Sequence, residues 1–150
     1  MRPAMQTNVP GYNELRIHHL GLLTGQPDAA MRTLSAFGYA LGETIGDPLQ
    51  KADLTMATHW DGGLNVEIIY PHEDNPGLRA LVKRKADYMY HVCYQTANAD
   101  AALERTRSRG VEAALVSAAK PAALFGGDPV SFYLFEGIGL VEFLETKSGV

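Results

Sequence analysis

Hydrophobic and polar positions follow the same order twice along the 150 residues of this chain. In the first half, an alternating stretch comes before a stretch with helical spacing that begins at Pro27 and stops at Gly38. Three further alternating stretches follow, separated by turn-forming residues such as Asp61-Gly62-Gly63. The pattern therefore predicts a helix over 27–37 and four strands, which cover 16–23, 39–45, 53–59 and 64–70.

The second half repeats this order. Asn98 is a suitable N-cap and Gly110 a stop for a helix over 99–109. Around that helix the pattern predicts four strands, which cover 88–95, 113–118, 130–135 and 140–145. Each half thus reads as a βαβββ unit, and the repetition indicates an internal duplication. We expect an α+β protein with two tandem βαβββ modules, divided as a lead-in over 1–14, a first module over 15–71, a linker with a short helix over 72–87 and a second module over 88–150.

Composition narrows the class of protein. Apolar residues make up 46% and charged residues 20% of the chain, which is typical of globular proteins. The formal net charge of −4 argues against nucleic-acid binding, and no apolar run is long enough to span a membrane. The single cysteine, Cys93, excludes an internal disulfide and a zinc site built from several cysteines. With no stretch of signal-peptide type in residues 1–13, we expect a cytoplasmic protein.

One histidine and one glutamate recur at matching places in the two halves. His19 and His91 lie in the first predicted strand of each half, and Glu67 and Glu142 lie in the last. The glutamate follows the histidine by 48 residues in the first half and by 51 in the second. A single strand histidine or glutamate is ordinarily inert or exposed. Four that repeat in register point to one common site.

The two glutamates carry most of this argument. Each lies between large apolar residues in a strand, so alternation turns the carboxylate toward the face opposite the helices. Burying an unpaired carboxylate is costly, and a cation is a partner that satisfies it. Two carboxylates and two imidazoles suit a divalent ion, and zinc, cobalt, nickel, manganese and iron all accept this set. We therefore predict one metal site formed by His19, Glu67, His91 and Glu142.

The pattern resembles the vicinal oxygen chelate superfamily, with methylmalonyl-CoA epimerase-like and glyoxalase-like members nearest. The resemblance rests on four short motifs, which are Ile17-His18-His19-Leu20-Gly21, Val66-Glu67-Ile68-Ile69-Tyr70-Pro71, Tyr90-His91-Val92 and Gly139-Leu140-Val141-Glu142-Phe143-Leu144-Glu145. It implies two βαβββ modules that form a half-open barrel around one divalent metal ion. The implied ligands are the same four residues, a set that bacterial-type glyoxalase I also has.

The resemblance implies a divalent-metal-dependent isomerase or epimerase that removes a proton next to a chelated carbonyl, such as that of an acyl-CoA or another acyl thioester. Glu142 is the implied base. Inversion needs an acid on the opposite face, and we propose Asp53, near the start of a strand expected to line the same cup. A solvated strand-end position is the other interpretation of Asp53. Alternation places His18 on the face opposite His19, and Cys93 on the face of His91.

Three alternatives stay open at this point. A glyoxalase I-type lactoylglutathione lyase needs only one base. An Fe(II) dioxygenase prefers two histidines and one carboxylate, so a fourth ligand counts against it. A non-catalytic binding or resistance protein of the same fold generally lacks the ligand set. In each case we expect a small-molecule partner, no nucleic acid, no membrane, and a homodimer that covers the open sheet edges.

Overall fold

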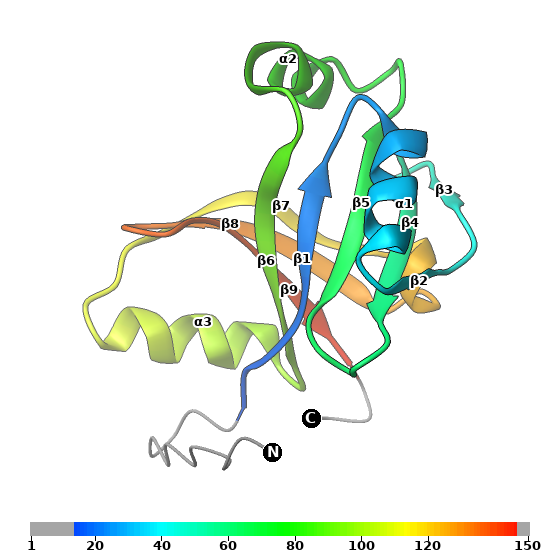
Figure 1. Cartoon of the computed structure of the whole chain (residues 1–150). Helices are drawn as coiled ribbons and strands as arrows, with labels where there is room; N and C mark the ends of the chain where they lie inside the picture. The colour runs from blue at the N-terminus through cyan, green and yellow to red at the C-terminus, as the bar shows by residue number, and fades with distance from the viewer. Residues whose placement is uncertain (1–13, 147–150) are drawn as a thin grey trace.

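A computed structural model describes residues 14–146 as one curved sheet of nine strands with three α-helices (Figure 1). The elements in chain order are β1 (Arg16–Leu23), α1 (Pro27–Ala36), β2 (Tyr39–Leu41), β3 (Ile45–Asp47), β4 (Ala52–His59), β5 (Asn65–Pro71), α2 (Pro76–Lys85), β6 (Tyr88–Thr96), α3 (Ala99–Ser108), β7 (Ala113–Pro121), the 3₁₀ turn η1 (Ala123–Phe125), β8 (Pro129–Phe135) and β9 (Gly139–Glu145). The α+β prediction is confirmed. The predicted lead-in over 1–14 lies, apart from Glu14, outside the described residues.

The duplication is visible in the strand order, β2-β4-β5-β1-β6-β9-β8-β7, with β3 paired to β4. Reading outward from the centre, each half places its last strand parallel to its first, then an antiparallel partner, then an edge strand. The first strands of the two halves, β1 and β6, pair antiparallel at the centre. The sheet curves without closing, which confirms the predicted half-open barrel of two βαβββ modules.

The observed elements differ from the predicted ones mainly in the first half. The strand predicted over 39–45 divides into β2 and β3, because residues 42–44 leave the ladder between them. The turn η1 was not predicted. The module and linker boundaries at 71, 72, 87 and 88 fall at or next to element ends, and as domain boundaries they stay a prediction.

The helices α1 and α3 cover the outer face of the sheet. Leu34 of α1 packs with Ala57, Val66 and Ile68, and Leu103 of α3 packs in the same way against the second half. Asn98 caps α3 by accepting a hydrogen bond from the amide of Ala101 at 3.0 Å. None of the helices within residues 14–146 has the length and hydropathy needed to cross a membrane.

Alternation along the strands then assigns the other residues to the inner, concave face. In β5, Val66 and Ile68 pack toward α1, so Glu67 and Ile69 face inward. In β9, Phe143 packs toward α3, so Glu142 faces inward. The strands that line the cup therefore bring both glutamates into its interior, as the sequence predicts.

Candidate metal centre

His19, Glu67, His91 and Glu142 converge on the floor of the cup. They come from the four central strands β1, β5, β6 and β9, which are adjacent in the sheet. All four are buried, with exposed fractions of 0%, 1%, 5% and 0%. Each offers a ligand atom, and these atoms all lie within 4.8 Å of one another.

The separations within the cluster match donors that share one ion. The Nε2 atoms of the two histidines are 3.3 Å apart. From His19 Nε2, the distances to Oε1 of Glu142 and Glu67 are 3.2 and 3.7 Å. From His91 Nε2, they are 3.7 and 3.9 Å. Because donors bind zinc at about 2.0–2.2 Å, two donors on one ion must lie within about 4.4 Å of each other.

Four buried polar atoms of this cluster lack a hydrogen-bond partner in the described part of the chain. Among the described residues, no hydrogen bond reaches Oε2 of Glu67, Nδ1 of His91 or either carboxylate oxygen of Glu142, although all are buried. Buried polar groups are normally satisfied, so four such atoms in one place need an explanation. A bound cation provides it for the carboxylates, and the nitrogen and oxygen donors suit a divalent ion. The residues present therefore fit the metal that the sequence predicts.

Burial and mutual repulsion set the protonation of the cluster. Burial lowers the pKa of His91 to about 4, so its imidazole is neutral at physiological pH and able to bind a metal. Burial, then the charge of Glu142 and of Asp47, raises the pKa of Glu67 well above its ordinary value. Burial opposes ionisation of Glu142 as well, but the contacts with His19 and His91 outweigh it and lower the pKa.

Gly21 makes room for one of the ligands. It lies opposite His91 in the β1–β6 ladder, and a Cβ at this position would stand 2.2 Å from Cε1 of the His91 ring. Real Cβ contacts are longer than 3.0 Å, so any side chain here would push the ring away. Phe132 contacts the same ring edge-to-face, with centroids 5.3 Å apart. Steric packing against Gly21 and Phe132 therefore fixes the position of the His91 ring.

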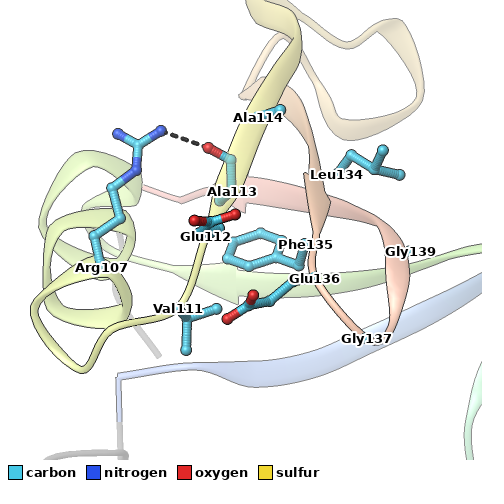
Figure 2. A pocket seen from close by; sticks show the side chains of 10 residues that line it. All are labelled: Arg107, Val111, Glu112, Ala113, Ala114, Leu134, Phe135, Glu136, Gly137 and Gly139. Carbon is cyan, nitrogen blue, oxygen red and sulfur yellow. Dashed lines mark hydrogen bonds between the residues drawn. The ribbon is translucent and has the colours of Figure 1, made fainter.

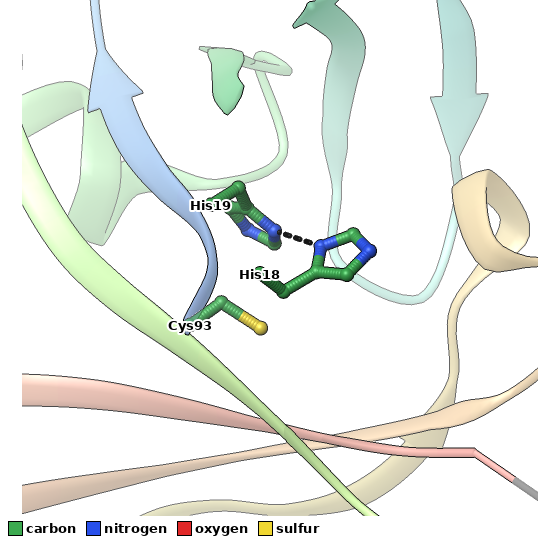
Figure 3. Close-up of side chains that lie close together, drawn as sticks. All are labelled: His18, His19 and Cys93. Atoms are coloured by element: carbon green, nitrogen blue, oxygen red, sulfur yellow. Dashed lines mark hydrogen bonds between the residues drawn. The ribbon is translucent and has the colours of Figure 1, made fainter. Parts of the chain in front are cut away.

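The prediction for His18 is wrong, and a β-bulge explains why. Ile17 and His19 pair with the consecutive residues Tyr94 and Cys93 of β6, so His18 is an extra residue in β1. The bulge breaks the alternation and turns the His18 ring toward His19, with 2.8 Å between their Nδ1 atoms (Figure 3). Burial, then the neighbouring His19, lowers the pKa of His18.

Cys93 faces the cup, as predicted. It pairs with His19 on one side and with Glu142 on the other, and it is fully buried. Burial, then the charge of Glu142, raises the pKa of this thiol far above its ordinary value. The thiol therefore stays protonated, as in a packed residue rather than a nucleophile.

Asp53 does not reach the metal cluster, which corrects the prediction that it lines the cup. It pairs with Tyr70 in the β4–β5 ladder, whereas Met56 pairs with Glu67, so Asp53 lies on the opposite face from Glu67. Its carboxylate bonds to Nε2 of His72 at 2.8 Å and is 43% exposed. The strand was predicted correctly, but the face that it turns inward was not.

A small cavity of about 190 Å³ borders the cluster, because His91 forms part of its wall. Tyr90 also lines this cavity, because a second bulge leaves it as an extra residue between Met89 and His91. Burial raises the pKa of Tyr90 to about 12. The sequence analysis does not predict this position, because no pattern in a single strand marks such a bulge.

A larger depression lies away from the cluster. It has a volume of about 810 Å³ and is lined by residues in and next to the α3–β7 and β8–β9 connections, which are Arg107, Val111, Glu112, Ala113, Ala114, Leu134, Phe135, Glu136, Gly137 and Gly139 (Figure 2). Arg107 donates to the carbonyl of Ala113 beside it. None of the four clustered residues lines this depression, so we assign it no part in the chemistry of the metal centre.

Comparison with known proteins supports the same architecture. Methylmalonyl-CoA epimerase from Mycobacterium tuberculosis superposes with a TM-score of 0.70 at 16% identity, covering 86% of each chain. Streptomyces coelicolor methylmalonyl-CoA epimerase, as a variant in complex with 2-nitronate-propionyl-CoA, gives 0.68 at 20% identity and covers 89% of this chain and 98% of its own. A hypothetical protein from Bacillus halodurans gives 0.70 at 16% identity, covering 91% and 97%.

At these identities the structural likeness shows the fold alone. A search of curated proteins finds no match to the chain. The family model described as the Glyoxalase/Bleomycin resistance protein/Dioxygenase superfamily matches residues 18–132. That range contains three of the four clustered residues and most of both modules. The chain belongs to the Glyoxalase/Bleomycin resistance protein/Dioxygenase superfamily.

Proposed function

We propose that the protein is a divalent-metal-dependent isomerase of the epimerase type, which removes a proton next to the carbonyl of an acyl thioester such as an acyl-CoA. The observation that carries this proposal is the buried cluster of His19, Glu67, His91 and Glu142, in which four polar atoms have no hydrogen-bond partner among the described residues. The similar fold of the methylmalonyl-CoA epimerases, one of them in complex with methylmalonyl-CoA, supports this choice of substrate class.

The four clustered residues would hold the ion. A divalent cation at this place supplies positive charge where negative charge develops on the carbonyl oxygen of a bound substrate. Glu142 is the proposed base, since neither of its oxygens accepts a hydrogen bond from the described part of the chain. It pairs with Phe132, which lines the cavity, so its carboxylate lies close to the space that a substrate would enter. The proton would pass from the substrate carbon to an oxygen of Glu142.

The cavity walls suit an acyl chain that ends in polar groups. Ile69, Leu78 and Phe132 form apolar walls that exclude water from the reacting carbon. Gln50 and Lys120 also line the cavity. A lysine ammonium here would attract an anionic substrate, such as one that carries a carboxylate or phosphates.

The side of the cavity across from Glu142 favours a second candidate function, a glyoxalase I-type lyase. Inversion at carbon needs a proton donor across from Glu142, and the described lining of the cavity contains no carboxylate. Tyr90 is present, but a hydroxyl with a pKa of about 12 gives up its proton reluctantly. Because it stays protonated at neutral pH, it is not available as the base in the reverse direction. A lyase that returns the proton on the same face needs one base only.

Isotope exchange distinguishes the two candidates. Protein prepared without chelator would be incubated in D₂O with methylmalonyl-CoA, and separately with the hemithioacetal of methylglyoxal and glutathione. Deuterium uptake at the α-carbon with unchanged constitution supports the epimerase. Conversion of the hemithioacetal to a thioester supports the lyase instead.

Metal analysis tests the site itself. Wild type, His91→Ala and a matched control, His72→Ala, would be compared, since His72 lies outside the cluster. We expect close to one equivalent of metal in wild type and in the control, and little in His91→Ala. Equally little metal in all three proteins would overturn the proposal. The homodimer and the cytoplasmic location stay predictions.

A further inference from the structure

The bulge at His18 places an imidazole directly behind a proposed metal ligand. The ring centroids of His18 and His19 are 5.1 Å apart and their planes are nearly perpendicular. Their Nδ1 atoms are 2.8 Å apart, which is a hydrogen-bond distance (Figure 3). Phe125 packs against both rings, edge-to-face on His18 and stacked on His19. His18 is therefore a fixed neighbour of His19.

The position of the shared proton follows from what the other nitrogen of His19 faces. Two Nδ1 atoms at this distance need one proton between them, and either ring could supply it. Nε2 of His19 points at the carboxylates of Glu67 and Glu142 and at Nε2 of His91. If Nε2 binds the ion, it must present a lone pair, so Nδ1 of His19 carries the hydrogen and Nδ1 of His18 accepts it.

We propose that His18 is a positioning residue for the metal centre. By accepting from Nδ1 of His19, it selects the tautomer that offers Nε2 to the ion and fixes the direction of that lone pair. This inference rests on the proposed metal site. It assigns to the chain a residue that acts through His19 and has no contact with the ion or the substrate.

The two ligand histidines differ in this respect. Nδ1 of His91 has no hydrogen-bond partner in the described part of the chain, and its ring is held by the gap at Gly21 and the edge of Phe132. His19 alone of the pair has an acceptor behind it. Loss of His18 should therefore weaken one ligand selectively and leave the ring of His91 in place.

The same residues could instead be a second metal site, and the distances argue against it. His18, His19 and Cys93 bring three potential ligand atoms within 4.8 Å of one another. Two nitrogens on one tetrahedral zinc ion, at about 2.0–2.1 Å each, lie about 3.3 Å apart. The 2.8 Å between the Nδ1 atoms is shorter and matches a hydrogen bond. The group therefore supports the cluster rather than forming a second one.

Three substitutions separate hydrogen bonding from packing. His18→Phe keeps a ring against Phe125 but removes the acceptor, and His18→Leu removes both. His18→Asn restores an acceptor, because the asparagine Oδ1 can occupy the place of Nδ1. His72→Leu is the control, a histidine lost outside the cluster.

Zinc affinity would be measured by competition with a chelating dye, and the imidazole nitrogens by ¹⁵N–¹H correlation of the zinc-loaded proteins. We expect wild type, His18→Asn and His72→Leu to bind alike and to show a protonated Nδ1 on His19. We expect His18→Phe and His18→Leu to bind zinc about 10–100-fold more weakly and to lose that shared-proton signal.

The outcomes that contradict the inference are distinct from those that contradict the metal site. Zinc affinity of His18→Phe equal to wild type overturns the positioning role and leaves the site intact. Affinity of His18→Asn as low as that of His18→Phe shows packing rather than hydrogen bonding, and also overturns it. Wild-type protein that binds no zinc overturns the proposed function and this inference together.

Discussion

Replacing Gly21 with alanine is the most direct test of the shape of the metal centre. The added Cβ would lie 2.2 Å from Cε1, 2.4 Å from Nδ1 and 2.7 Å from Nε2 of His91. The nearest ordinary contact is 3.4 Å, so the ring must move by about 1.2 Å at its closest atom. Ligand distances in metal sites are fixed to within about 0.2 Å, so a displacement of this size removes His91 from the coordination set.

Gly21→Ala has two opposing effects on the free energy of unfolding, and their magnitudes decide whether the variant is more or less stable than wild type. Overpacking a buried position costs about 1–3 kcal/mol. Alanine gains only about 0.5–1 kcal/mol over glycine inside a strand, because the unfolded chain has less freedom. We expect the metal-free Gly21→Ala protein to be less stable than wild type. Losing a ligand should weaken zinc binding by at least about 100-fold, the upper end of what supporting residues contribute.

The assay is urea denaturation of the metal-free proteins together with zinc competition on the folded ones. Gly77→Ala, in the first turn of α2, is the matched control. The contact nearest to its new Cβ is Oδ1 of Asn75, at an ordinary distance of 4.0 Å. This substitution should raise stability by about 0.5–1 kcal/mol and leave zinc affinity unchanged. If Gly21→Ala binds zinc as tightly as wild type, the ring of His91 is not positioned as we argue.

Three further predictions follow from other contacts. Asp53→Asn should leave turnover unchanged, because Asp53 faces away from the cup and bonds to His72, and steady-state kinetics would check this. Asp47→Asn should destabilise the protein by about 1–3 kcal/mol at neutral pH, because the carboxylate accepts hydrogen bonds from backbone and side-chain donors that an amide nitrogen cannot bond. Hydrogen bonds hold the pKa of Asp47 low despite burial, so its stabilisation is present above its unfolded pKa and is lost as pH falls through the folded pKa. For Glu67 the sign reverses, because burial raises the pKa: the metal-free protein should lose stability as pH rises from the unfolded toward the folded pKa, and Glu67→Gln should remove this loss in denaturation series across pH.

Most of the metal centre could be predicted from the sequence, because a carboxylate that is buried in a strand is conspicuous among its apolar neighbours. A carboxylate between apolar residues in a strand is costly unless it has a partner, and the chain places one at Glu67 and another at Glu142. The two histidines repeat with them, since the duplicated topology puts first and last strands side by side in each half. Alternation within β5 and β9 then orients both glutamates toward the cup without knowledge of the neighbouring strands.

Asp53 shows where this reasoning stops. Which face of β4 turns inward is set by its register with β5, where Met56 pairs with Glu67, and a shift of one residue would have exposed Asp53 to the cup instead. Apolar residues occupy both faces of β4, such as Leu54 and Ala57, so the strand itself contains no clear preference. Register depends on pairing between strands, and a single sequence does not display it.

Each half of the chain has a bulge next to its ligand histidine, but the residue in the bulge differs between the halves. Each bulge inserts one residue just before a ligand histidine, His18 before His19 and Tyr90 before His91, and each turns that residue back toward the cup. The backbone device is common to both halves, but one side chain accepts a hydrogen bond behind its ligand while the other presents a hydroxyl to the cavity. Because the duplication preserves the position and not the chemistry, the asymmetry between these two neighbours is where the halves of the site can differ in function.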